Sequence, residues 1–147
     1  MTLLIIGARA KPHNRAPFPF VMDVNDEYTR IGNKILAGGD FEEIRPFSNF
    51  VILSSDEEKK KNKKIVYGEC KLVSKLYKWI CPYDFFIIIY EPNIAGFTDE
   101  QLEILIEHEL RHMGYDFNGN EPTPYIIPHD VEEFDAIIEK WGLYWDR

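Results

Sequence analysis

Apolar residues recur with helical spacing in the stretch that follows Asp23. Asn25 or Asp26 can cap the start of this stretch, and Gly38-Gly39 can end it. The apolar positions fall mainly three or four residues apart, at Tyr28, Ile31, Ile35 and Leu36. This pattern predicts an amphipathic helix whose apolar side packs on a core.

Apolar runs in the middle of the chain predict strands at residues 50–53, 65–67 and 83–90. The last run is the strongest, because residues 85–89 are unbroken Phe-Phe-Ile-Ile-Ile, which indicates burial on both faces in a central strand. The lysine-rich residues 56–64 predict a solvated hairpin loop, and a phosphate-binding patch is the alternative. Residues 71–79 fit a further strand or a short helix.

Two helices are predicted in the last third of the chain, each from a capping box. Thr98 and Gln101 form the first box, and the helix that they start runs into residues 108–112. Asp130 and Glu133 form the second box. The second helix carries one apolar stripe, made of Phe134, Ile137, Ile138 and Trp141.

Length and charge narrow the class of protein. A chain of 147 residues, 45% of them hydrophobic, suits a single domain with a substantial core. Its net charge of −8 argues against a general nucleic-acid binder. No apolar run approaches the roughly 18 residues of a membrane span, and residues 1–10 lack the basic leader of a signal peptide. Cys70 and Cys81 form no CxxC pair, so we expect reduced thiols in a cytoplasmic protein.

The predicted elements give an α+β fold. It comprises a small twisted sheet of three or four strands, an N-terminal helix, the helix over residues 98–112 and a C-terminal helix. Residues 1–23 contain three prolines and are expected to form an irregular arm, with residues 24–147 as the domain.

The most informative motif is His108-Glu109-Leu110-Arg111-His112, an HExxH sequence. On a helix, His108 and His112 lie about 40° apart on one face, so both imidazoles can bind one tetrahedral zinc. Glu109 lies about 100° from His108, on the buried side, and is the candidate general base. The charged residues Glu103, Glu107 and Arg111 occupy the opposite arc. The alternative is a solvated surface helix without a metal.

A catalytic zinc needs a third protein ligand and keeps its fourth position for water. His129, just before the second capping box, is the leading candidate. Glu133 comes next, although the cap already needs its side chain. Glu132 comes last, because it points about 160° away from Phe134 and should face water.

Two tyrosines near the motif, Tyr115 and Tyr125, can donate a hydroxyl to the oxyanion that forms during hydrolysis. For each one taken alone, an ordinary core or rim tyrosine is the alternative reading.

Several segments together resemble the putative phage metallopeptidase family, whose small proteins are similar in plan to SprT-like minimal zinc peptidases. The segments are residues 67–71, 83–85, 107–112 and 129–134. The resemblance covers roughly residues 25–145. It implies one zinc ion, a small sheet behind the HExxH helix (a minimal zincin-like plan), and His129 as a ligand. It implies no particular substrate.

The hypothesis is therefore a zinc metallopeptidase that acts on a protein or peptide substrate, with Glu109 as base. An edge strand beside the cleft is expected to hold the substrate by strand addition. The competing hypothesis is a non-enzymatic phage or prophage protein that contains zinc and binds a host factor. Glu109 favours the enzyme, because a structural zinc site has no use for a carboxylate that is not a ligand.

Overall fold

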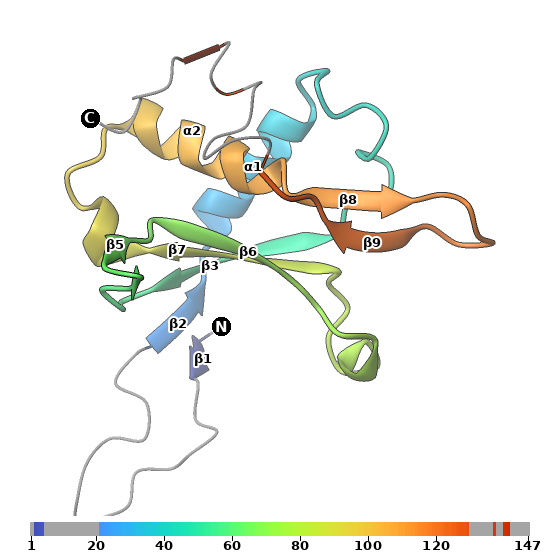
Figure 1. Cartoon of the computed structure of the whole chain (residues 1–147), viewed down its shortest axis with the longest axis horizontal. Coiled ribbons are helices and arrows are strands. Elements are labelled where there is room, and N and C mark those ends of the chain that lie inside the picture. The colour runs from blue at the N-terminus through green and yellow to red at the C-terminus, as the bar shows by residue number, and fades with distance from the viewer. Residues whose placement is uncertain (1, 5–20, 130–136, 138–139, 142–147) are drawn as a thin grey trace, which may run out of the picture.

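A computed structural model of the protein describes residues 2–4, 21–129, 137, 140 and 141. The fold is α+β, as the sequence predicts, with a five-stranded sheet in the order β1-β2-β3-β7-β6. Two helices, α1 (Asp26–Leu36) and α2 (Asp99–Leu110), lie on the same side of this sheet (Figure 1). No helix in the described part of the chain is long and apolar enough to cross a membrane.

The main sheet contains the strands β1 (Thr2–Leu4), β2 (Val21–Val24), β3 (Phe50–Ser55), β6 (Gly68–Leu72) and β7 (Phe85–Tyr90). The two longest strands, β3 and β7, pair in parallel, and every other pair is antiparallel. The continuous apolar run lies in β7, between β3 and β6, so its prediction as an interior strand is confirmed. Strand β6 forms one edge of the sheet.

The sheet is larger than the three or four strands predicted. The extra strands come from residues 1–23, where an irregular arm was expected: Thr2–Leu4 pairs with Val21–Val24, which pairs with β3. Residues 2–4 and 21–23 of this segment therefore belong to the sheet, and residues 5–20 lie outside the described residues. Strands this short carry little periodicity, and their partners are distant in sequence.

The remaining elements are short. The lysine-rich segment forms the hairpin β4 (Lys60–Lys61) and β5 (Lys64–Ile65), as predicted. Asn62 and Lys63 make its turn, with φ angles of 52° and 67°. The undecided residues 71–79 contain the end of β6 and the 3-10 helix η1 (Lys75–Tyr77). A second 3-10 helix, η2 (Glu91–Ile94), precedes α2.

A second hairpin follows α2 and was not predicted. It consists of β8 (Met113–Asp116) and β9 (Thr123–Ile126), paired antiparallel beside the end of α2 (Figure 1). Strand β9 contains Pro124, which removes a backbone donor and weakens the sequence signal for a strand.

Helix α1 begins where the sequence predicts. Asn25 is the N-cap, and its Oδ1 accepts a hydrogen bond of 2.9 Å from the backbone N–H of Tyr28. The Asn25 side chain also donates to Ser54 Oγ at 2.8 Å. The cap therefore joins the start of α1 to strand β3.

The core lies between the two helices and the sheet. Ile52 and Ile87, which are register partners in β3 and β7, are 0% exposed, as are Ile106 and Leu110 of α2. Burial of a side chain of this size contributes about 1.5–3 kcal/mol. The apolar side of α2 thus fixes the helix against the sheet.

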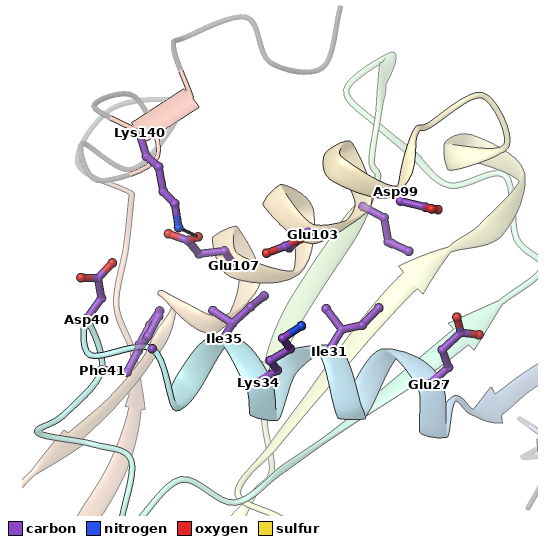
Figure 2. Close-up of a pocket in the computed structure, with 12 residues that line it drawn as sticks. Glu27, Ile31, Lys34, Ile35, Asp40, Phe41, Asp99, Glu103, Glu107 and Lys140 are labelled. Carbon is purple, nitrogen blue, oxygen red and sulfur yellow. Dashed lines mark hydrogen bonds and ion pairs between the residues drawn. The ribbon is translucent and has the colours of Figure 1, made fainter.

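A buried ion-pair network links α2 to two distant segments. Glu107 is 2% exposed, and its Oε2 accepts from Arg111 at 2.8 Å while its Oε1 accepts from Lys140 at 3.1 Å. Arg111 also contacts Asp40 Oδ2 at 3.2 Å and lies over the ring of Phe41. Figure 2 shows Lys140 extending toward Glu107 from the C-terminal segment.

This network corrects the expectation for the polar arc of α2. Glu103 is exposed as expected, but Glu107 is buried, one turn further along. The C-terminal segment covers that turn: Ile137 is 0% exposed and packs with Ile104 and Trp141.

The C-terminal helix is described at three residues only. Residues 137, 140 and 141 are helical. Its predicted cap at Asp130 and Glu133, and the stripe residues Phe134 and Ile138, lie outside the described residues.

Glu107→Ala should lower the free energy of unfolding by about 2 kcal/mol, because it removes a buried carboxylate with two cationic partners. The loss is smaller than for a fully buried pair, because Lys140 is half exposed and Arg111 retains its contact with Asp40. Urea unfolding followed by circular dichroism measures it. The matched control is Glu103→Ala, an exposed glutamate on the same arc, which should change stability by less than about 0.5 kcal/mol. Equal effects of the two variants would contradict a stabilising role for the network.

Candidate metal centre

The helix that carries the HExxH motif starts at the predicted capping box. The backbone N–H of Gln101 donates to Thr98 Oγ1 at 3.1 Å, and the backbone N–H of Thr98 donates to Gln101 Oε1 at 2.8 Å. The helix ends at Leu110, two residues earlier than predicted. The N–H of His112 then donates to the Glu109 carbonyl at 3.1 Å, which tightens the last turn. His112 therefore remains on the same face as His108.

Three histidine rings converge at this end of α2. His108 Nε2 and His129 Nε2 are 3.0 Å apart, and one ring nitrogen from each of His108, His112 and His129 lies within 4.8 Å of the other two. Imidazole nitrogens bound to one tetrahedral zinc lie about 3.3 Å apart, given Zn–N bonds of about 2.0–2.1 Å. The spacing therefore fits a single ion with small side-chain adjustments.

The ring of His112 is oriented by a backbone carbonyl. Its Nδ1 lies 2.6 Å from the carbonyl oxygen of Ile127. A carbonyl can only accept, so Nδ1 carries the proton and Nε2 is left with its lone pair for a metal. The N–H of Ile127 donates back to the His112 carbonyl at 2.7 Å, which extends the β8–β9 ladder by one pair.

This reciprocal bond also places His129. Ile127 directly follows β9, and His129 is two residues further along. The hairpin thus returns the chain to the end of α2, with His129 beside His108.

Glu109 lies beside the histidines and is buried, with 3% of the residue exposed. One of its carboxylate oxygens is 3.9 Å from His108 Nε2. A Cβ atom added at Gly68 would lie 3.4 Å from the same oxygen and 3.1 Å from the carbonyl oxygen of Ile88. A side chain at position 68 would therefore crowd the neighbouring strand β7, whereas Glu109 lies at ordinary contact distance from this position.

Cys70 lies two residues further along β6 and is partly buried. Burial raises the pKa of its thiol, and the negative charge of Glu109 raises it further. The thiol therefore stays protonated at neutral pH, and its chemistry favours neither a nucleophile nor a zinc ligand.

The two candidate tyrosines have different surroundings. Tyr115 is buried; its hydroxyl donates to Asp84 Oδ2 at 2.8 Å and accepts from the Asn49 N–H at 3.2 Å. Burial and the bond to Asp84 raise its pKa. Tyr125 is 45% exposed and lies opposite Gly114 in the hairpin. Its ring would come within 2.7 Å of a Cβ atom at position 114, so a side chain there would have to displace Tyr125 and Ile127.

Sequence reasoning missed Gly68 and the Ile127 carbonyl. Glycine inside a strand does signal a close approach by another group, so Gly68 was open to detection. A backbone carbonyl gives no signal in the sequence, so the role of Ile127 could not be predicted. Glu132 and Glu133, the alternative ligands, lie outside the described residues.

A cavity of about 460 Å³ lies between α1 and α2, on another part of the surface (Figure 2). Its lining contains none of the three histidines. Ile31, Ile35, Phe41 and Leu102 contribute apolar groups, and carboxylates and two lysines surround them. It is separate from the metal centre.

Comparison with known proteins gives one match. No curated protein and no solved structure matches the chain. The model of the family described as "Putative phage metallopeptidase" matches residues 21–147, which include α2, the β8–β9 hairpin and all three histidines. The protein belongs to this putative phage metallopeptidase family.

Proposed function

We propose that the protein is a zinc-dependent peptidase that hydrolyses a peptide bond, with His108, His112 and His129 as zinc ligands and Glu109 as general base. The convergence of three imidazoles beside a buried carboxylate carries this proposal. The family match supports the same class of activity.

The donor set favours zinc. Three neutral imidazoles and an open fourth position are typical of catalytic zinc, whereas magnesium and calcium prefer oxygen ligands. A zinc ion held there would act as a Lewis acid, which would lower the pKa of a bound water molecule and polarise the substrate carbonyl.

Glu109 moves the proton in this proposal. Its carboxylate accepts a proton from the attacking water and passes it to the nitrogen of the leaving amine. Its carboxylate lies beside His108 Nε2 and Gly68, and is therefore close to the proposed ligands.

Tyr125 is the better candidate to donate a hydrogen bond to the oxyanion. It is exposed on β9, the strand that leads to His129. The hydroxyl of Tyr115 already donates to Asp84, which favours a structural role for that residue.

The substrate is proposed to pair with strand β6. This strand is at the sheet edge, and its first residue, Gly68, lies next to Glu109. Strand addition would satisfy the open backbone groups of β6 and bring an extended peptide past the carboxylate.

His129→Ala should weaken zinc binding by at least about 100-fold, because it removes a ligand. Wild type should contain close to one zinc per chain and gain thermal stability on zinc addition, and the variant should lose most of that gain. Competition with a zinc-chelating dye measures affinity. Glu132→Ala is the control and should retain wild-type affinity. If Glu133→Ala abolishes binding while His129→Ala preserves it, the ligand assignment is wrong.

Glu109→Gln should keep the fold and the zinc but lower the hydrolysis rate by a factor of roughly 10² or more, because the amide cannot act as base. Proteomic analysis of host-lysate digests, with equal amounts of both proteins, identifies substrates and measures the difference. A contaminating protease would cut equally in both samples. Identical cleavage patterns would leave the non-enzymatic zinc protein as the better account.

A pair of conservative variants separates the two tyrosines. Tyr125→Phe should lower kcat by roughly tenfold or more with little change in stability. Tyr115→Phe should instead lower the free energy of unfolding by about 1–2 kcal/mol and leave kcat nearly unchanged, because it strands the hydrogen-bond partners of a buried hydroxyl. Peptide hydrolysis and urea unfolding of both variants are the measurements. The reverse pattern would assign the oxyanion role to Tyr115.

A further inference from the structure

The loop between β6 and β7 exposes a concentration of large apolar side chains. We call residues 72–80 the apolar loop. Its exposed members are Leu72 (43%), Leu76 (69%), Tyr77 (53%), Trp79 (81%) and Ile80 (59%). Single exposed apolar residues are ordinary, but five within nine consecutive residues indicate an interaction surface. Figure 1 shows the loop protruding from the body of the protein where β6 ends.

The apolar loop is also cationic within an acidic protein. Residues 71–83 contain Lys71, Lys75 and Lys78 and no acidic residue, whereas the whole chain has a net charge of −8. Lys78 pairs with Asp84, and Lys71 is half exposed, 3.9 Å from Glu69. Lys75 is exposed. With Glu69 and Asp84 included, residues 69–84 have a net charge of +1, and this local excess of positive charge complements a ligand with acidic groups.

The apolar loop continues the strand that lines the candidate active site. Gly68, at the start of β6, lies against Glu109. Side chains alternate along a strand, so Gly68, Cys70 and Leu72 share one face. At a rise of about 3.3 Å per residue, Leu72 is about 13 Å from Gly68. An extended peptide beside β6 spans this distance with about four residues.

We propose that the apolar loop is a docking site for the substrate, and that it selects protein segments combining apolar and acidic side chains about four residues from the scissile bond. This inference rests on the proposed peptidase function. Leu76, Trp79 and Ile80 contact the apolar side chains of the segment. Lys71 and Lys75 pair with its carboxylates.

An anionic lipid surface would have the same charge and apolar character as this ligand. The position of the loop favours a peptide. A lipid surface would need only the tip of the loop, whereas the loop begins at the edge strand that reaches Glu109. A peptide that binds both the apolar loop and the edge strand would run along β6.

Peptide binding to the zinc-loaded Glu109→Gln protein tests the docking site without hydrolysis. The probes are two fluorescein-labelled peptides of fourteen residues with identical leucine positions and either glutamate or lysine between them. Fluorescence anisotropy should show the acidic peptide binding at least about tenfold more tightly. Trp79→Ser should weaken it by about tenfold. Lys75→Glu should reduce or reverse the preference for the acidic peptide.

The matched controls lie on the β4–β5 hairpin. Ile65→Ser replaces an apolar residue that is 54% exposed, and Lys60→Glu reverses an exposed lysine. Both should bind the acidic peptide as the Glu109→Gln parent does. Equal losses in Trp79→Ser and Ile65→Ser would overturn the inference. So would binding to phosphatidylserine vesicles that depends on Trp79, without any peptide binding.

Hydrolysis separates this inference from the proposed function. In the protein with Glu109 intact, Trp79→Ser should raise KM for the acidic peptide and leave kcat nearly unchanged. If wild type cleaves the peptide and Trp79→Ser has the same KM, docking fails while the peptidase stands. If the loop binds the peptide but wild type never cleaves it, the peptidase proposal fails while the docking surface stands.

Discussion

The reciprocal hydrogen bonds between His112 and Ile127 determine how the candidate metal centre is assembled. One bond, of 2.6 Å, fixes the His112 ring through Nδ1, and the other, of 2.7 Å, joins the two backbones. Without them, the end of α2 would present two histidines and the third would lie on a separate segment. The β8–β9 hairpin is therefore the element that brings His129 to His108. Its backbone ladder carries out this positioning, and the side chain of Ile127 packs against Ile104 and Ile137.

The other half of the centre depends on packing. Ile106 and Leu110 pack α2 on the sheet, and Glu109 then lies beside Gly68 at the start of β6. The opposite side of the helix is tied to the C-terminal segment through Glu107 and Lys140. The helix with the HExxH motif is thus held from the sheet and from the C-terminal segment. Rigid support of this kind keeps ligand and base geometry within the narrow tolerance that catalysis needs.

Patterns within short stretches of sequence predicted the features that depend on neighbouring residues, such as helix caps and the interior strand. The capping box at Thr98, the Asn25 cap, the interior strand predicted over 83–90 and the α+β class all follow from short-range patterns. The spacing of His108 and His112 predicted that they share a face, and the structure places His129 beside them. The family resemblance is confirmed by the match over residues 21–147.

What sequence reasoning missed depends on partners that are distant in the chain. From the sequence, Glu107 is expected to face solvent. In the structure, Lys140 and the C-terminal segment cover it. Strands β1 and β2 are short, and their pairing with each other and with β3 spans long stretches of sequence. Strand β9 contains a proline, and the group that orients His112 is the backbone carbonyl of Ile127, directly after β9, which no residue type encodes. Tyr115 and Tyr125 looked equivalent, and only their surroundings distinguish them.

The central claim is that one zinc ion is held by three imidazoles, with Glu109 beside it and unbound. X-ray absorption at the zinc edge, on protein loaded with one equivalent, tests this most directly. The account predicts the scattering of three imidazoles and one further light atom at about 2.0–2.1 Å, unchanged in Glu109→Gln. A sulfur at about 2.3 Å, only two imidazoles, or a spectrum altered by Glu109→Gln would contradict it.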